Sequence, residues 1–179
     1  VSNGSTSISP DLTALRSGNG DLASVHTARN EYGADLVAMM VDTGSAYGYV
    51  GVGNLLTNWN GVDYQCFTVN SIRSVEISHT LTHEVGHNLG AHHSKDQASD
   101  PGPNEYLDDQ YSAGYYFTAS NNGVAYHTIM AYNDDGYDNF YYPAPLFSTP
   151  DLDHQGTVAG NANYADNTRL LEQTFDDVA

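Results

Sequence analysis

The sequence predicts one domain of the α/β (α+β) class, with a sheet and helices in its first half and irregular structure through most of its second half. Apolar segments of strand length alternate with segments of helical periodicity up to about residue 90. Gly, Asn, Asp, Tyr and Pro then dominate to about residue 160, and a last helical pattern follows. A length of 179 residues with 40% hydrophobic content is enough to bury one core without disulfides or repeats.

The first elements are expected in the following order. Residues 1–10 are rich in Ser, Asn and Gly and are expected to be mobile. Helical spacing begins near Leu22 and ends near Gly33, where a glycine can take the left-handed conformation. Residues 34–41 are almost uninterruptedly apolar and predict a buried strand.

Two further short strands and a long helix should complete the first half. Residues 49–56 predict a short strand, although their glycines are equally compatible with a loop. A turn at Asn60 and Gly61 precedes a strand over residues 64–69. From Ser71 to Leu89 the periodicity is helical.

The second half should contain little regular structure before a final helix. That helix is expected from Ala165 to Val178, with Leu170, Leu171 and Phe175 facing the core. The remainder of this half is expected to be loops.

Charge excludes several partners. Five Lys and Arg stand against 22 Asp and Glu, which gives a net charge of −17. Nucleic acid and anionic membranes bind basic surfaces, so neither is an expected partner. The acidic surface could bind a structural Ca²⁺ through carboxylate oxygens, or it could simply be solvated. Both interpretations stay open.

Cys66 is the single cysteine, so no disulfide can form within the chain. It is expected to be a buried strand residue, and the alternative is a reactive thiol. The sequence has no signal peptide and no apolar run of membrane-spanning length.

Residues 83–93 follow the pattern HExxHxxGxxH, which is the most specific signal in the chain. On a helix, His83 and His87 lie about 40° apart and can reach one metal ion. Glu84 points away from that pair, which suits a general base acting on a metal-bound water. Gly90 can end the helix and turn the chain so that His93 becomes a third ligand. Three imidazoles leave one tetrahedral position open, as in catalytic zinc sites.

An apolar stripe is expected on the opposite side of the same helix. Ile77, Leu81, Val85 and Leu89 repeat every four residues and lie about 160° from the two histidines. We therefore expect one face of the helix to pack and the other to bind the metal.

The motif resembles that of the metzincin metalloendopeptidases, and residues 128–132 resemble their Met-turn. The resemblance implies a twisted mixed sheet and the active-site helix in an upper part of about residues 11–90. An irregular lower subdomain with a C-terminal helix would then span about residues 91–179. It also implies that Met130 forms an apolar floor beneath the zinc. Tyr132 would lie near the zinc and donate a hydrogen bond to the tetrahedral intermediate.

Within the metzincins the sequence is most similar to the reprolysin (adamalysin-like) group, particularly bacterial peptidyl-Asp metallopeptidases. Residues 29–37, 83–93 and 147–150 carry this similarity. Ser94 stands where reprolysins usually have Asp, so the hydrogen bond of that Asp must come from elsewhere. The 33 residues before Ala34 are few for the strand, helix and strand that the family places there. We expect a smaller sheet or a missing N-terminal piece, and Val1 is typical of a processed or truncated chain.

Other candidate ligands fit less well. Glu105 lies in a pattern similar to NExxxD, whose acidic residue is a zinc ligand in gluzincins, but His93 already completes the site. Residues 133–138 have the oxygen density of a calcium loop without EF-hand spacing, and a solvated turn is the other interpretation. His92 fails the GxxH spacing and is expected at the surface or behind the ligands. His79 reads as an ordinary polar helix residue, and His127 could approach the cleft.

These observations together predict a secreted, monomeric zinc endopeptidase acting on extracellular proteins or peptides. Glu84 would take a proton from the zinc-activated water and pass it to the leaving amine. The alternatives are a zinc-binding module that holds peptides without cutting them and a zinc amidase acting on a non-protein substrate. Cleavage beside acidic residues would need a cation in the cleft, for which Arg73, Lys95 and Arg169 are the candidates.

Overall fold

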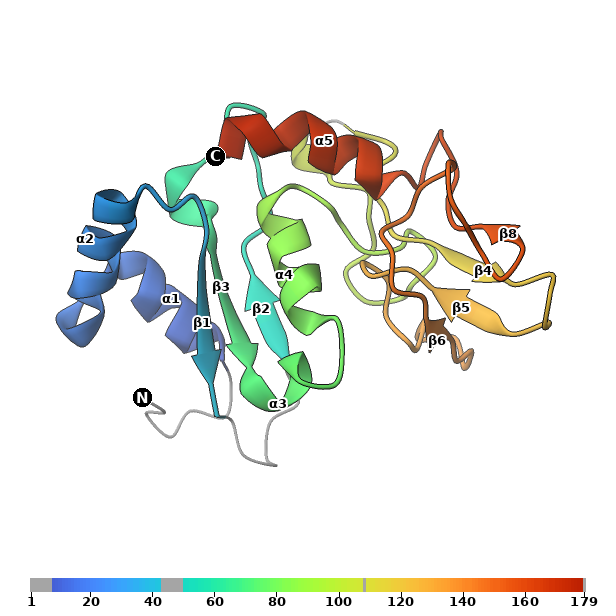
Figure 1. The fold of residues 1–179 in the computed structure, drawn as a ribbon, viewed down its shortest axis with the longest axis horizontal. Coiled ribbons are helices and arrows are strands. Elements are labelled where there is room, and N and C mark those ends of the chain that lie inside the picture. The colour runs from blue at the N-terminus through green and yellow to red at the C-terminus, as the bar shows by residue number, and fades with distance from the viewer. Residues whose placement is uncertain (1–7, 43–49, 108, 179) are drawn as a thin grey trace.

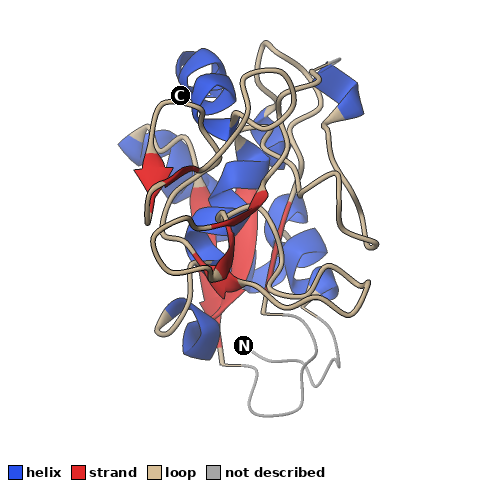
Figure 2. Cartoon of the chain, turned by 90° about the vertical axis from the view of Figure 1, so that its right-hand side faces the viewer, coloured by secondary structure: helices blue, strands red, loops and turns tan. Residues whose placement is uncertain are grey.

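A computed structural model describes residues 8–42, 50–107 and 109–178 of the chain. Its first half is a small sheet with helices on both faces, and its second half consists largely of loops with short strands (Figures 1 and 2). A C-terminal helix returns to the first half and closes the core. The α/β class with mixed sheets and a final helix is confirmed. Among the described residues, no helix has the length and apolar character that a membrane crossing requires.

The chain begins with two helices that cover one face of the sheet. Helix α1 (Ser9–Ser17) has a proline in its first turn and ends at Gly18, whose φ is 58°. Ile8, Leu12 and Leu15 are buried at i, i+4 and i+7 against the sheet. The expectation of a mobile segment is therefore wrong for residues 8–10, and residues 1–7 lie outside the described residues.

The second helix agrees with the prediction. After a 3₁₀ turn, η1 (Gly20–Leu22), helix α2 (Ala23–Tyr32) ends at Gly33, which has a φ of 61°. Leu22 and Val25 pack beside the α1 residues on the same face of the sheet.

The sheet has the strand order β1-β3-β2. Strand β3 (Phe67–Ser71) is central and buried throughout, and β1 (Val37–Val41) pairs with it in parallel, with Val37 opposite Phe67. β1 is therefore an edge strand and not the buried strand expected over residues 34–41, because only one of its sides is paired. Ala38 and Met40 of this strand are exposed.

Strand β2 (Gly51–Gly53) forms the other edge and runs antiparallel to β3, with Gly51 opposite Asn70. The expected strand over residues 49–56 is thus shorter, and Tyr49 lies outside the described residues. The chain from β2 to β3 includes a 3₁₀ turn, η2 (Asp63–Gln65), and Gly61 with a φ of 74°. Cys66 is buried, as expected, but it lies just before β3 and not in the strand, because the 3₁₀ turn occupies the start of the strand expected over residues 64–69.

The long helix expected over residues 71–89 is interrupted. The structure contains a short helix α3 (Ile72–Val75) and, after a turn, helix α4 (Thr80–Asn88) on the sheet face opposite α1 and α2. The Ser78 hydroxyl donates to the Ser74 carbonyl at 2.7 Å, a local bond that competes with helix continuation. Ile77 falls in this turn and is 86% exposed, so the predicted stripe is wrong there, while Leu81, Val85 and Leu89 are half-buried.

The second half contains short elements connected by loops (Figure 2). A 3₁₀ turn, η3 (Glu105–Leu107), precedes a sheet of β4 (Tyr116–Thr118), β5 (Ala125–His127) and β6 (Tyr142–Pro143). Strands β7 (Asp153–His154) and β8 (Thr157–Val158) form a separate pair.

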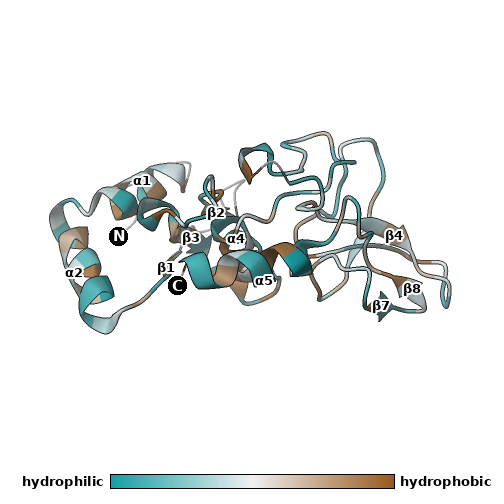
Figure 3. Ribbon diagram, turned by 90° about the horizontal axis from the view of Figure 1, so that it is seen from above, coloured by the Kyte–Doolittle hydropathy of each residue, from teal (hydrophilic) through white to brown (hydrophobic). Residues whose placement is uncertain are grey.

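Helix α5 (Asn167–Val178) joins the two halves of the molecule. Leu170 is fully buried with Leu56, Ala91 and Met130, and the Thr174 hydroxyl donates to the Leu89 carbonyl at the end of α4, at 2.7 Å. The exposed side of the helix is hydrophilic over much of its length, as its colouring in Figure 3 shows. The C-terminal end of α4 is consequently held by α5, while its length packs on the sheet.

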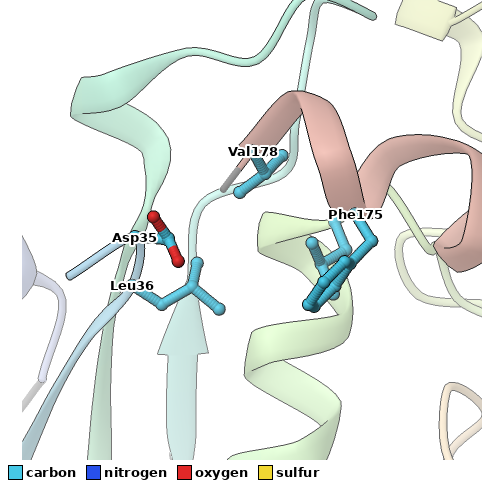
Figure 4. A pocket seen from close by; sticks show the side chains of 5 residues that line it. Asp35, Leu36, Phe175 and Val178 are labelled. Atoms are coloured by element: carbon cyan, nitrogen blue, oxygen red, sulfur yellow. The ribbon is translucent and has the colours of Figure 1, made fainter. Parts of the chain in front are cut away.

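Phe175 does not face the core as predicted, since it is 61% exposed. Phe175 lies one turn after Leu171 on α5, and its ring lines a surface pocket together with Val178. With Asp35, Leu36 and Leu89 these side chains line a pocket of about 110 Å³ between α5 and the start of β1 (Figure 4).

Candidate metal centre

Three histidine side chains converge from α4 and the turn that follows it. His83 and His87 lie one turn apart on α4, and His93 follows the helix. The Nε2 atom of His93 is 3.2 Å from Nε2 of His83 and 3.1 Å from Nε2 of His87. The structure therefore brings together the three residues that the sequence motif singled out as metal ligands.

Gly90 makes this convergence possible. Its φ is 91°, a conformation that side chains of L-residues rarely adopt, and it reverses the chain directly after α4. The Ala91 N–H then donates to the Gly86 carbonyl at 2.9 Å, which fastens the turn to the helix. A Cβ at Gly90 would also lie 2.7 Å from Cδ1 of Leu107. The expected role of Gly90 in returning His93 to the helix is consistent with this geometry.

Backbone carbonyls fix the orientation of all three imidazoles. Nδ1 of His83 lies 2.7 Å from the Ile129 carbonyl, Nδ1 of His87 lies 2.8 Å from the Ala91 carbonyl, and Nδ1 of His93 lies 2.8 Å from the Asp100 carbonyl. A carbonyl only accepts hydrogen bonds, so each Nδ1 must carry the proton and donate it. Each Nε2 is left with a lone pair that points toward the other two.

Burial keeps these imidazoles neutral. It lowers the pKa of His83 to about 3 and that of His93 to about 4, and it holds the pKa of His87 well below its usual range. The neighbouring imidazoles add to these shifts because a second positive charge so close would be repelled. Neutral imidazole is the form that binds a metal.

The nitrogen positions fit a zinc ion. Zn–N bonds of about 2.0–2.1 Å at tetrahedral angles place pairs of ligand nitrogens about 3.3–3.4 Å apart. The two Nε2 separations of 3.1 and 3.2 Å are close to this value. Three unprotonated nitrogens facing one another would repel without a cation among them, so the donor set itself favours a bound metal.

Glu84 lies next to this cluster but does not belong to the set of nitrogen donors. Its side chain is buried beneath strand β2, and its carboxylate accepts a hydrogen bond from the Gly53 N–H. Burial raises the pKa of this carboxyl to about 8, and the Gly53 hydrogen bond partly opposes that shift. A carboxyl with a raised pKa can both accept and release a proton near neutral pH.

The segment that resembles a Met-turn lies under the histidines. Met130 is fully buried in the core with Leu170, and its Sδ is in the space that a Cβ at Gly86 of α4 would enter, 2.6 Å away. The preceding residue, Ile129, supplies the carbonyl that orients His83. This arrangement agrees with the implied role of Met130 as an apolar floor.

Tyr132 lies beside two of the three histidines. Its ring centroid is 4.6 Å from that of His93 and 5.8 Å from that of His83, and the side chain is 40% exposed. The main-chain N–H of Tyr132 donates to Oε1 of Gln97 at 3.3 Å, which connects the Met-turn to the loop after His93. The structure thus places Tyr132 beside the three histidines, whereas the carboxyl of Glu84 lies against β2 on the same helix as His83 and His87.

The remaining candidates are separate from this cluster or support it. Glu105 is exposed and is not grouped with the three histidines. His92 is buried behind them, where its Nδ1 accepts a hydrogen bond from the His93 N–H at 2.8 Å. His79 is the exposed residue at the start of α4, and His127 is half-buried near His83.

A second grouping of His92, His93 and Asp100 could in principle hold an ion. Nδ1 of His93 is already bonded to the Asp100 carbonyl, and Nδ1 of His92 to the His93 N–H. This grouping is therefore better explained as support for the His93 ligand.

The acidic loop over residues 133–138 does not support a calcium site. The Asp135 carboxylate accepts hydrogen bonds from the Tyr137 N–H at 2.7 Å and from Asn139 Nδ2 at 2.8 Å. Its oxygens thus stabilise the loop itself, which matches the interpretation of this segment as a turn.

Sequence reasoning missed the groups that orient the predicted ligands. The carbonyls of Ala91, Asp100 and Ile129 carry no sequence signal, since every residue has a carbonyl. Ser94, which stands where reprolysins usually have Asp, is buried with its hydroxyl accepting from the Asp96 N–H. The pairing of Gly53 with Glu84 was also missed.

Comparisons with known proteins agree with this site. The family model described as metallopeptidase family M12 matches residues 2–141. A peptidyl-Asp metalloendopeptidase of Stenotrophomonas maltophilia (strain R551-3) is 32% identical over 168 residues, 92% of this chain. One of Xanthomonas campestris pv. campestris is 32% identical over 173 residues, 94% of this chain. The chain spans 36% of the length of each of these curated relatives.

A solved structure shows the same fold at greater distance. A chain from the "Structure of a chaperone-substrate complex" superposes with a TM-score of 0.60 at 18% sequence identity, covering 97% of this chain and 25% of that one. The match to the family model covers most of the residues that build the sheet, the three histidines and the Met-turn. This chain therefore belongs to metallopeptidase family M12.

Proposed function

We propose that this chain is a zinc-dependent endopeptidase that hydrolyses peptide bonds in proteins or peptides outside the cell. The observation that carries the proposal is the convergence of three Nε2 lone pairs, at 3.1 and 3.2 Å, at the helix that also carries the buried carboxyl of Glu84. Membership of a metallopeptidase family and relatives named peptidyl-Asp metalloendopeptidase support it.

His83, His87 and His93 would hold the ion, which leaves room for a water molecule and a substrate carbonyl. Zinc bound by three imidazoles acts as a Lewis acid, lowers the pKa of water to about 7 and stabilises negative charge on oxygen. The three backbone carbonyls behind the rings keep each Nε2 aimed at one point during turnover.

Glu84 would handle the proton. Its carboxylate accepts a proton from the attacking water and then donates it to the nitrogen of the leaving amine, which needs a group that exchanges protons near neutral pH. In the metal-free site burial raises the pKa of this carboxyl to about 8, so its carboxylate form is a stronger base than an exposed carboxylate. A cation held by the histidines would draw that pKa downward, toward the carboxylate form needed at the start of the cycle.

Tyr132 would stabilise the developing oxyanion. Its ring lies against His83 and His93, so its hydroxyl is carried on the same side of the site as these ligands. A positioned hydroxyl that donates to an oxyanion strengthens its hydrogen bond as charge develops.

The substrate would bind along the edge strand β2. Within the part of the chain that the structure describes, β2 pairs on one side only, with β3, and an extended peptide would add to its other side beside Glu84. Pairing of this kind uses main-chain hydrogen bonds, so it depends little on most of the peptide's side chains.

Specificity for acidic residues, suggested by the names of the relatives, would need a cation. Arg73 pairs with Asp42 at 3.1 Å, and the guanidinium of Arg169 lies over the Tyr111 ring at 3.9 Å. The ammonium of Lys95 lies over the Tyr164 ring at 3.7 Å, two residues after His93 along the chain. Lys95 and Arg169 are both exposed, and neither has a carboxylate within 4.0 Å among the described residues; Lys95 is the better candidate because it follows the ligand His93 so closely in the chain.

Digestion of a mixed peptide pool tests the function and its alternative together. The zinc-loaded protein should produce fragments that mass spectrometry can map, and a chelator should stop their formation. A non-proteolytic peptide-recognition module would bind zinc in the same metal analysis and produce no fragments. A zinc amidase acting on another substrate would likewise leave the pool intact. Acidic residues at the mapped sites would support the specificity, and their loss in Lys95→Met would assign it to Lys95.

Secretion, a monomeric state and the absence of nucleic-acid or membrane partners belong to the same proposal. The net charge of −17 supports the last of these, because it disfavours binding to anionic polymers and surfaces. Gel filtration of the active protein would test the monomeric state.

A further inference from the structure

Two glycines of β2 lie directly against Glu84. A Cβ built at Gly51 would be 2.6 Å from Oε1 of Glu84, 2.7 Å from its Cγ and 2.6 Å from Cγ2 of Thr80. A Cβ built at Gly53 would be 2.6 Å from the Glu84 carbonyl oxygen and 3.2 Å from Oε2. No side chain fits at either position without displacing the carboxyl or α4.

Glycine is not needed here for the backbone conformation. Neither residue is among those with a positive φ, and both lie in a regular strand paired with β3. The requirement for glycine therefore comes from the close approach of Glu84, and not from a turn.

The strand register shows why the Gly53 N–H is free to reach Glu84. Ser71 N–H donates to the Val50 carbonyl at 2.8 Å, so Val50 and Ser71 form a hydrogen-bonded antiparallel pair. Because such pairs alternate along antiparallel strands, Val52 is the next residue whose main chain points toward β3. The main-chain groups of Gly51 and Gly53 point to the outer side of β2, where Gly53 donates to the Glu84 carboxylate.

We propose that Gly51 and Gly53 are positioning residues for the general base. The Gly53 N–H would hold the Glu84 carboxylate, and the missing side chain at Gly51 would leave the space that the carboxylate occupies. The inference rests on the proposed function, in which Glu84 transfers the proton. It goes beyond that function by assigning the placement of the base to the strand that would also pair with the substrate.

The consequence is a fixed distance between the base and the substrate backbone. A peptide paired with the edge of β2 and a carboxylate bonded to β2 share one reference element. Misplacement of a catalytic group by about 1 Å can reduce the rate by about a hundredfold, so this shared reference matters for turnover.

Gly51→Ala tests the proposal kinetically. The variant should lose about ten- to a hundredfold in kcat, with KM within about twofold and zinc affinity by calorimetry unchanged, because the ligands are not touched. Gly123→Ala is the matched control, since a Cβ there meets nothing within 4 Å while its φ of 70° makes the change strained. Wild-type kcat in Gly51→Ala, or a parallel loss of zinc affinity, would overturn the proposal.

A stability cycle provides a readout that does not depend on activity. In the metal-free protein, Gly51→Ala should lower Tm by at least about 2–4 °C, because its Cβ overlaps the Glu84 side chain. In a Glu84→Ala background the same change should cost less than half as much, and adding Thr80→Ser should reduce the cost further by removing Cγ2. If Gly51→Ala lowered Tm equally in the wild-type and Glu84→Ala backgrounds, the Glu84 side chain would not occupy the space at Gly51.

The two tests separate the positioning role from the function itself. If zinc-loaded wild type does not cut peptides, the proposed function fails, whereas the stability cycle still reports whether Glu84 fills the space at Gly51. If wild type cuts, Glu84→Gln does not, and Gly51→Ala cuts normally, only the positioning role is wrong.

Discussion

The proposed role of Tyr132 depends on its hydroxyl group alone. Its ring is fixed beside His83 and His93 by the 4.6 and 5.8 Å ring contacts, and 40% of the side chain remains exposed. Tyr132→Phe keeps these contacts and removes only the hydroxyl. We expect kcat to fall about ten- to a hundredfold with zinc content unchanged, because one oxyanion donor is lost. Turnover within twofold of wild type would show that the hydroxyl is not used.

The metal ligands could be predicted residue by residue, whereas their supports could not. A helix fixes the relation of His83 to His87, and Gly90 allows one sharp reversal before His93, so local geometry was sufficient. The carbonyls of Ala91, Asp100 and Ile129 that orient the rings are identical in chemistry to every other carbonyl. Only the folded arrangement identifies them.

At the scale of secondary structure, the close packing of α4 on Met130 leaves no room for a side chain at Gly86. Gly86 faces the Met130 sulfur, and a Cβ there would meet Sδ at 2.6 Å and Cε1 of Phe147 at 3.1 Å. Gly86→Ala should therefore lower the free energy of unfolding by about 1–3 kcal/mol, even though alanine is the better helix former by about 1 kcal/mol.

Urea unfolding at constant metal occupancy measures this difference. Thr82→Ala is the control, since Thr82 is exposed on the same helix and its replacement should be neutral or slightly stabilising. A gain of stability in Gly86→Ala equal to that in Thr82→Ala would show that α4 does not pack on Met130.

The elements also show where sequence patterns were insufficient. The α2 helix with its Gly33 end and the final helix were predicted, because periodicity and a glycine stop are local signals. Helix α1 was missed although Ile8, Leu12 and Leu15 have helical spacing and Pro10 lies in the first turn. The edge position of β1 and the exposure of Phe175 depend on strand order and on where α5 docks, which no local pattern contains.

For the whole molecule, metal binding should contribute to stability. The three ligands come from α4 and the turn after it, so one ion would fasten this turn to the helix, and the hydrogen bond of His83 to the Ile129 carbonyl would extend its effect to the Met-turn. Removing zinc with a chelator should lower Tm by about 5–10 °C at metal concentrations near 100 times Kd. Differential scanning calorimetry with and without the chelator measures this difference. An unchanged Tm would show that no bound metal ion stabilises the fold.

The metal-free molecule should be sensitive to acid. The pKa values of His83 and His93 are lowered to about 3 and about 4, below the value near 6.5 of an unfolded chain. Protons therefore bind the unfolded chain preferentially as the pH falls through 6.5, and stability decreases until the folded pKa values are reached. At pH 5 each of these histidines should cost about 2 kcal/mol relative to pH 7.5.

Urea unfolding of the metal-free Glu84→Gln variant at pH 7.5 and pH 5 tests this dependence. The variant is used because the wild-type carboxyl, whose pKa is raised to about 8, takes up a proton in the folded state as the pH falls and so opposes the effect of the histidines. His154 lies outside the metal cluster, so His154→Gln should leave the pH dependence in place, whereas His93→Gln should reduce it. Equal stability at both pH values would mean that the imidazoles are not held neutral in the folded state.

The proposed chemistry depends on Glu84 as the group that moves the proton. Glu84→Gln keeps the size of the side chain and a carbonyl oxygen that can accept from the Gly53 N–H, but it cannot take a proton from water. Cleavage of the peptide pool should be compared for wild type and Glu84→Gln at equal zinc content, verified by metal analysis. We expect one zinc ion per chain in both and a loss of at least about 10³-fold in rate for the variant. Peptide cleavage by Glu84→Gln at the wild-type rate would contradict the proposed mechanism.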